Sequence, residues 1–127
     1  MIYIPIDMNT PIQTKTPINI QNNTTNNFPE IIFELHNGKY YFDLGDSCTL
    51  YATVTNTDLG TVSFSGTLSI MNPHRGQIQC VPNSKDFSET GVNTLTVLVD
   101  TGNIQYSFQQ TIFVQSMQSN IIKYFKG

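Results

Sequence analysis

The residues of this chain best suited to metal chemistry are two histidines and a pair of aspartates. His36 and His74 each stand in a turn-forming segment, and neither has a cysteine or glutamate at the spacing of a zinc site. Asp43 and Asp46 offer oxygen ligands for calcium, but the alternating acidic loop and terminal glutamate of an EF-hand are missing. Asp46 is better explained as a turn residue, so the sequence predicts no metal site.

A catalytic nucleophile would need an activating partner, and no motif in the chain supplies one. Ser47 and Cys48 are adjacent, yet no recognisable motif places a histidine beside them. Cys48 also belongs to the apolar face of a predicted strand, and burial makes a thiol inert. The chain has no glycine-rich phosphate loop, no dinucleotide-binding fingerprint and no paired-carboxylate motif. We therefore predict that the protein is not an enzyme and uses no cofactor.

Aromatic side chains suggest a second kind of function. Tyr40, Tyr41, Phe42 and Tyr51 are close in sequence, and exposed tyrosines stack on sugars or fill protein interfaces. In a β-sandwich, half of the segment KYYFD (residues 39–43) must face the core, which accounts for about two of these rings. A surface adhesin or carbohydrate-binding module that uses Tyr40, Tyr41 or Tyr51 is thus one candidate function, with a glycan as its receptor.

Charged side chains are sparse. Six basic and nine acidic residues in 127 give a net charge of −3, which disfavours nucleic-acid binding and a polybasic membrane-surface patch. No run of about 18 apolar residues predicts a membrane-spanning helix, and residues 1–7 do not resemble a signal peptide. The polarity comes instead from Asn, Gln, Thr and Ser, which can form large contacts without burying unpaired charges. An assembly subunit and the codon bias of an AT-rich genome explain this composition equally well.

From residue 28 onward, alternation of apolar and polar residues predicts β-strands. Turn residues separate them, as in Asn37-Gly38 and the segment NPHRG at 72–76. Residues 84–88 suit a single helical turn over one end of a sheet. The expected strands are 30–35, 39–43, 48–55, 61–70 with a bend at Gly66, 77–80, 94–99 and 104–114.

Short strands at roughly ten-residue spacing predict an all-β fold, an antiparallel Ig-like β-sandwich of about seven to eight strands over residues 29–115. The immunoglobulin cysteine signature is missing, because Cys48 and Cys80 are only 32 residues apart and the chain has no tryptophan. Buried, reduced thiols are favoured over a disulfide.

The two ends of the chain differ from this middle. Residues 1–7 suit an edge strand, but residues 8–29 hold one charge, three prolines and an Asn/Thr cluster. We therefore predict an extended N-terminal arm over residues 1–28, in which Ile18 and Ile20 suit a short strand. The tail, residues 116–127, carries four large apolar side chains, and it either caps the sandwich or docks on a neighbouring subunit.

One part of the chain resembles a known family. The order of turns and strands from residue 45 to residue 114 is similar to the N-terminal domain of phage upper-baseplate proteins, an Ig-like β-sandwich. The departures are the long arm and the absence of the helical linker that usually follows. The matching segments are IMNPHRG at 70–76, Ile78, Cys80, KDFS at 85–88, Gly91 and the entry DLGDSCTL at 43–50.

The resemblance implies a structural role and no active site. We expect a stand-alone phage virion protein, such as a head fibre, a capsid decoration protein or a tail or baseplate component. Its partners would be other virion proteins and further copies of the same chain. An arm segment at 16–20 would pair with an exposed sheet edge on a neighbour, so deleting residues 1–27 would leave a folded domain that does not assemble. The predicted partner-binding residues are Thr16, Ile18, Ile20, Ile121, Ile122, Tyr124 and Phe125.

Overall fold

The computed structural model describes residues 1–9, 17–22, 30–56, 60–83, 86–87 and 90–116 of the chain. Among these residues it has ten β-strands, one 3-10 helix and no α-helix. The elements are β1 (Ile2–Asp7), β2 (Ile18–Asn22), β3 (Ile31–Asn37), β4 (Tyr40–Tyr41), β5 (Thr49–Asn56), β6 (Gly60–Ser63), β7 (Thr67–Asn72), η1 (Pro73–Arg75), β8 (Gln77–Val81), β9 (Gly91–Asp100) and β10 (Gln105–Ser116).

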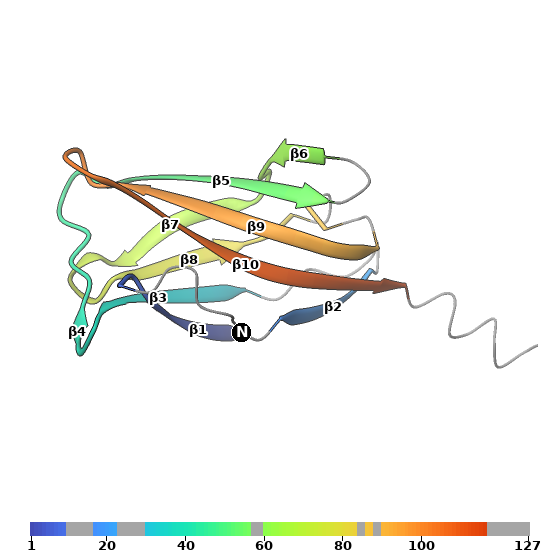
Figure 1. The fold of residues 1–127 in the computed structure, drawn as a ribbon, viewed down its shortest axis with the longest axis horizontal. Helices are drawn as coiled ribbons and strands as arrows, with labels where there is room; N and C mark the ends of the chain where they lie inside the picture. Colours follow the sequence, from blue (N-terminus) through green and yellow to red (C-terminus); the bar gives the residue numbers. More distant parts are fainter. Residues whose placement is uncertain (10–16, 23–29, 57–59, 84–85, 88–89, 117–127) are drawn as a thin grey trace, which may run out of the picture.

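The strands form two sheets that pack face to face (Figure 1). We call them sheet A, with the order β1-β3-β8-β7 and β4 beside β3, and sheet B, with the order β2-β10-β9-β5-β6. The predicted all-β sandwich is confirmed. Its sheets are mixed rather than antiparallel throughout, because β1 runs parallel to β3 and β2 runs parallel to β10.

The N-terminal residues differ most from expectation. Residues 1–28 were predicted to be an arm outside the sandwich, but β1 and β2 form one edge strand of each sheet, along the lower edge of Figure 1. Ile6, Ile18 and Ile20 are buried in the core that both sheets share. Pro5, which has no N–H to donate, is accommodated because β1 pairs on one side only. The predicted edge strand at 1–7 and short strand at Ile18 and Ile20 are confirmed, whereas the separate arm is wrong.

The core lies between the sheets and is built by alternation along each strand. On β9 the buried residues Leu95, Val97 and Val99 alternate with half-exposed neighbours. Phe33 of sheet A packs edge-on against Phe108 of sheet B, with 4.9 Å between the ring centroids. The other fully buried large side chains include Ile6, Ile31, Leu35, Leu44, Ile78, Phe87 and Ile112.

The chain crosses from sheet B to sheet A at residues 64–66. We predicted a single strand over 61–70 with a bend at Gly66; the bend is instead a break, with β6 and β7 in different sheets. At Gly66 an added Cβ would meet the carbonyl oxygen of Val81 and lie 2.8 Å from Cα of Pro82, so only glycine fits between these backbones.

The carboxylate of Asp86 anchors this crossing. The backbone N–H and the hydroxyl of Ser65 donate to its Oδ1 at 2.6 and 2.8 Å, and the backbone N–H of Asn83 donates to Oδ2 at 2.7 Å. Next to it, Phe87 is fully buried at the end of the core. Of the helical turn predicted at 84–88, only these two residues are described, and they form a turn.

Candidate interaction surfaces

Glu34 is the buried charge around which the outer face of sheet A is organised. It lies on the side of β3 that faces away from the core, between Pro5 of β1 and Gln77 of β8. Its neighbours cover it so fully that only 5 % of the residue is exposed. We call Glu34 together with Tyr3, His36, Tyr41, Arg75 and Gln77 the Glu34 cluster.

Hydrogen bonds connect the Glu34 cluster. The side-chain amide of Gln77 donates to Glu34 Oε2 at 2.8 Å, and Nε2 of His36 lies 2.9 Å from Glu34 Oε1. Arg75 Nη2 lies 3.8 Å from Glu34 Oε2 and donates to the hydroxyl of Tyr41 at 2.8 Å. A buried carboxylate costs little when donors surround it in this way.

These contacts also shift proton affinities. Burial alone would raise the pKa of Glu34, but hydrogen bonds with Tyr3, Gln77 and His36 outweigh it, so the pKa of Glu34 is lowered. Burial raises the pKa of Tyr3, and the hydrogen bond with Glu34 and the negative charge of Glu34 act in the same direction, to a value of about 12. Glu34 is therefore ionised and Tyr3 is neutral at pH 7.

The turn NPHRG at 72–76 places Arg75 in this cluster. Pro73 opens η1, and Gly76 ends it in the left-handed conformation, with φ 65°. The turn predicted from the sequence is thus confirmed. Gly76 accepts a hydrogen bond from the backbone N–H of Leu35 at 2.9 Å, which seats the turn against β3.

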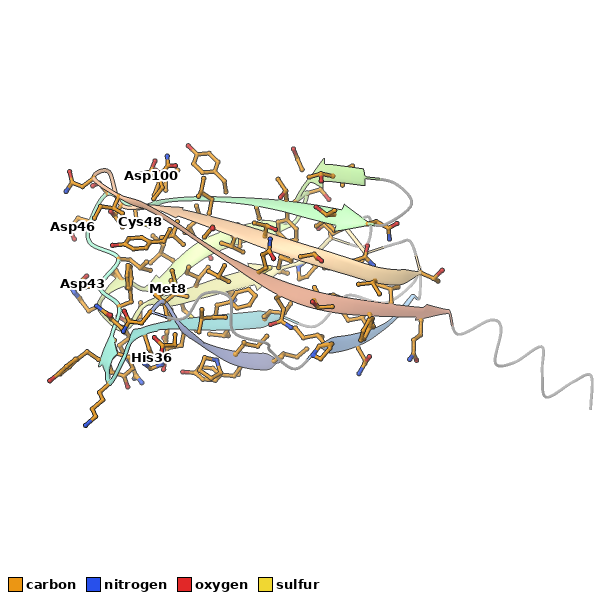
Figure 2. All side chains as sticks on the ribbon, in the orientation of Figure 1. Met8, His36, Asp43, Asp46, Cys48 and Asp100 are labelled. Atoms are coloured by element: carbon orange, nitrogen blue, oxygen red, sulfur yellow. The ribbon has the colours of Figure 1, made fainter. Side chains whose placement is uncertain are left out.

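Several of the residues considered as metal ligands or as a nucleophile lie at one end of the sandwich. Figure 2 shows His36, Asp43, Asp46 and Cys48 at this end. His36 does pair with a carboxylate, but that of Glu34 is buried and so cannot reach a substrate, as a general base must. His74 lies 3.7 Å from Asp43 on the exposed surface. No group of three or more metal-ligating side chains forms within the described residues.

Both cysteines are free thiols. Cys80 is fully buried, as predicted, and burial raises its pKa to about 12. Cys48 was predicted to be a buried residue of the strand 48–55, and this is wrong: it lies just before β5 and is only half-buried. Burial raises the pKa of the Cys48 thiol as well.

The candidate sugar-binding tyrosines are divided between the sheets. Tyr40 and Tyr41 form β4 of sheet A, whereas Tyr51 lies on β5 in sheet B. All three are exposed, but Arg75 lies over the ring of Tyr41 at 4.7 Å and His36 contacts the same ring, with 5.3 Å between centroids. Tyr41 therefore has less free ring surface for a sugar than Tyr51, which is 56 % exposed.

The outer face of sheet B is an uncharged surface rich in threonine. Strand pairing aligns Thr111, Thr94, Thr55 and Thr61 in one row across β10, β9, β5 and β6. The next row holds Gln109, Thr96, Thr53 and Ser63, and the one after it Ser107, Leu98 and Tyr51. We call these three rows the threonine face.

Charge is confined to the rim of this surface. Among the described residues that point outward from sheet B, Asp100 alone is charged, and it lies at the end of β9 in a row with Thr49 and Gln105. By contrast, the outer side of sheet A carries Glu34, with Arg75 beside it. The two outer faces of the sandwich therefore differ in chemistry.

The threonine face was not predicted from the sequence as a surface. The threonines of 49–55 were visible as the polar side of a strand, and those of 94–99 alternated with apolar residues. What could not be read from the sequence was the register that brings Thr55, Thr94 and Thr111 together, although these residues are far apart in the chain.

Of the seven predicted partner-binding residues, two lie in the core of the sandwich and five lie outside the residues that the structure describes. Ile18 and Ile20 face the core of their own chain, at 7 % and 6 % exposure, because the parallel ladder with β10 turns them inward. Their assignment to a neighbouring chain is therefore wrong. Thr16, Ile121, Ile122, Tyr124 and Phe125 lie outside the described residues.

Within the described residues, no helix is long and apolar enough to cross a membrane. Comparison of the chain with protein-family models and with curated proteins finds no match.

Proposed function

We propose that this chain is a structural subunit of a phage virion, either a head fibre, a capsid decoration protein or a tail or baseplate component. It acts through protein–protein contacts and catalyses no reaction. The observation that carries the proposal is the threonine face, which presents hydroxyl and amide groups on four neighbouring strands with no charge among them.

Such a surface suits a lasting protein contact. Burying an unpaired charge costs far more free energy than burying a hydroxyl that finds a new partner, and protein interfaces are depleted of charge at their centres. Tyr51 adds a large, rigid contact group next to Leu98 in register. Because both sheet faces are held by a common core, the surface is also rigid, which lowers the entropy lost on binding.

The virion context is supported by the resemblance to the upper-baseplate domain. The strand orders of the two sheets resemble those of immunoglobulin-like domains if β3, β5, β7, β8, β9 and β10 correspond to strands B, C, D, E, F and G. The parallel pairing of β1 with β3 departs from that pattern. The covered carboxylate of Glu34, which has no access to a substrate, supports the non-catalytic part of the proposal.

The test is to look for the chain in particles. Phage particles produced from the genome that encodes this chain are purified and analysed by quantitative mass spectrometry and immunogold electron microscopy. We expect a fixed copy number per particle and labelling at one position. A chain that is abundant in the infected cell but missing from purified particles would contradict the proposal.

Sugar binding is the second candidate function, favoured by the exposure of Tyr51 among hydroxyl and amide groups. An exposed aromatic ring stacks on a sugar while neighbouring polar groups bind its hydroxyls. The test is a glycan array with Tyr51→Ala and Tyr40→Ala, both exposed positions in different sheets. Selective loss of binding in Tyr51→Ala would support the glycan; no binding by the unaltered chain would eliminate it.

A further inference from the structure

We propose that Asn37 is a site of spontaneous chemical modification, where the side-chain amide is lost and isoaspartate forms, and that opening of β4 controls the rate. Asn37 is the last residue of β3 and the only asparagine of the chain that a glycine follows. It is exposed, and it leads into the turn formed by Gly38 and Lys39. This inference does not depend on the proposed virion role.

The reaction requires water and no other reagent. The backbone nitrogen of Gly38 attacks Cγ of Asn37, so a bond forms between these two atoms. The bond from Cγ to Nδ2 breaks, and ammonia leaves with the proton of the Gly38 amide. Water then opens the resulting cyclic imide. Where it breaks the bond between the Gly38 nitrogen and the main-chain carbonyl carbon of residue 37, the chain continues through Cγ as isoaspartate; opening at Cγ gives aspartate. No atom is oxidised or reduced.

Glycine favours this attack because no side chain shields its nitrogen. The hydrogen bond that the Gly38 N–H donates to Asp7 Oδ1 is long, at 3.4 Å, and so restrains the nitrogen little. The turn between β9 and β10 offers a comparison, since Asn103 is also exposed and the N–H of Ile104 donates an equally long bond to Thr101 Oγ1. The residue that follows, glycine or a β-branched isoleucine, distinguishes the two asparagines.

Pairing with β4 holds Asn37 in an unreactive conformation. Ring closure needs the side chain and the following nitrogen on the same side of the Cα–C bond, whereas the extended backbone of a strand turns them apart. Asn37 pairs with Tyr40, so this ladder must open before the reaction. β4 has only two residues, both exposed, at one end of the sandwich (Figure 1). Short exposed elements open at a small cost in free energy, so the reactive conformation is accessible without unfolding of the core.

Contacts of Tyr41 keep β4 closed. Its hydroxyl accepts a hydrogen bond from Arg75 Nη2 at 2.8 Å, and the guanidinium group lies over its ring at 4.7 Å. The ring of His36 contacts the same tyrosine, with 5.3 Å between centroids. These contacts join β4 to the rest of the Glu34 cluster. Loss of one of them increases the open population of β4 and therefore the rate at Asn37.

The modified chain cannot re-form the original ladder. Isoaspartate places an additional carbon in the main chain at residue 37, so the two residue pairs that join β3 to β4 lose their common register. We expect β4 to stay open and Tyr41 to leave Arg75. A change at an exposed turn would thus reach the Glu34 cluster.

The experiment incubates the full-length chain at pH 8 for several weeks and analyses its peptides by mass spectrometry, with fragmentation that distinguishes isoaspartate from aspartate. We expect isoaspartate at Asn37 and a conversion at least about tenfold faster than at Asn103, whose following side chain blocks the attack. Tyr41→Phe removes only the hydroxyl that Arg75 binds. It should accelerate conversion at Asn37 about fivefold, the effect of one hydrogen bond in an exposed contact, and leave Asn103 unchanged.

Two further variants make the test specific. Arg75→Ala removes the same hydrogen bond from the other side and should accelerate the reaction at least as much. Asn37→Gln is the matched control, because it keeps the carboxamide but must close a larger ring, and it should stay unmodified. Asn103 reports on the fold of each variant, since loss of the whole fold would accelerate both asparagines.

Hydrogen exchange provides a second readout. The N–H of Phe42, which donates to the carbonyl oxygen of Leu35 at 2.9 Å, should exchange faster in the modified chain than in the unmodified chain. Equal rates of conversion at Asn37 and Asn103 would overturn the modification site. An unchanged rate at Asn37 in both Tyr41→Phe and Arg75→Ala would overturn the control by β4.

Discussion

At the scale of single residues, Gly76 and Gly45 have almost the same backbone conformation in different surroundings, with φ of 65° and 72°. At Gly76 an added Cβ would lie 2.6 Å from the carbonyl oxygen of Leu35 and 2.7 Å from that of Phe42; at Gly45 it would meet nothing within 4 Å. Gly76 is thus required both for its dihedral angle and for the close approach of three backbone segments.

We therefore expect Gly76→Ala to cost about 3 kcal/mol or more in the free energy of unfolding, and Gly45→Ala only about 1–2 kcal/mol, the cost of the left-handed conformation alone. Urea denaturation of both variants measures the difference. Equal losses would show that the turn shifts to make room for the methyl group and that the backbone contacts at Gly76 contribute little.

Glu34 makes stability depend on pH in the acid range. Its folded pKa is lowered, since hydrogen bonds with Tyr3, Gln77 and His36 outweigh burial, so the folded state binds its proton less readily than the unfolded state. The resulting stabilisation is complete above the unfolded pKa of about 4.3 and is lost as the pH falls through the folded pKa.

We expect Glu34→Gln to be about 1–3 kcal/mol less stable than the unaltered chain at pH 7, the typical contribution of hydrogen bonds to a charged group. The gap should narrow as the pH falls below about 4, because the carboxyl group of the unaltered chain is then neutral as well. Urea denaturation at pH 7, 4 and 3 tests this, with Asp46→Asn on the exposed surface as the control. A gap that stays constant with pH would show that packing, and not charge, holds Glu34 in place.

At the scale of elements, the strands of the middle of the chain could be predicted because one face of each is buried and alternation is then strong. The segment 72–76 was also correctly predicted as a turn, since turn chemistry is local. The hairpin expected at Asn37-Gly38 forms one residue later, at Gly38-Lys39, because Asn37 still pairs with Tyr40 in the ladder. The N-terminal strands could not be distinguished from an arm. β1 and β2 are short edge strands, with Pro5 inside β1 and Pro17 just before β2. Only the tertiary ladders with β3 and β10 show that they complete the core.

Glu34 and the threonine face could not be predicted for the same physical reason. Glu34 looked like the polar residue of an alternating strand, and its burial depends on side chains from β1, β8 and η1. The threonine face likewise depends on strand register between distant segments. Features that arise from pairing of distant strands leave no trace in a local pattern.

Deleting residues 1–27 should consequently unfold the domain, and not leave it intact as predicted from the sequence. The deletion removes the buried side chains of Ile6, Ile18 and Ile20, each worth roughly 1.5–3 kcal/mol, which together rival the total stability of about 5–15 kcal/mol of a typical domain. Circular dichroism and thermal denaturation of the truncated chain provide the measurement. A cooperative transition at the original temperature would contradict the role of β1 and β2 in the core.

A point variant on β2 tests the same core packing with a smaller expected loss of stability. Ile18 faces the core and the adjacent Asn19 faces outward, so Ile18→Ala should cost about 2–4 kcal/mol and Asn19→Ala within about 0.5 kcal/mol. Both substitutions alter the same strand and differ only in the face they affect. Similar effects at the two positions would mean that β2 does not pack as a strand of sheet B.

At the scale of the whole molecule, the two sheets share one core, and Cys80 is part of it. No disulfide links the described cysteines, so their reactivity can report how the fold opens. Cys80 is fully buried with a pKa of about 12, hence both access and ionisation are suppressed in the folded state, whereas Cys48 is only half-buried. Alkylation of Cys80 should therefore require unfolding of the entire sandwich.

In a Cys48→Ser variant, alkylation by iodoacetamide at pH 8, followed by mass spectrometry, isolates this reaction. We expect the free energy of opening obtained from the labelling rate of Cys80 to equal the global free energy of unfolding and to have the same dependence on urea concentration. Cys48, measured in Cys80→Ala, should react much faster. A weaker urea dependence at Cys80 would mean that sheet A opens without sheet B, and the sandwich would then consist of two separable layers rather than one cooperative unit.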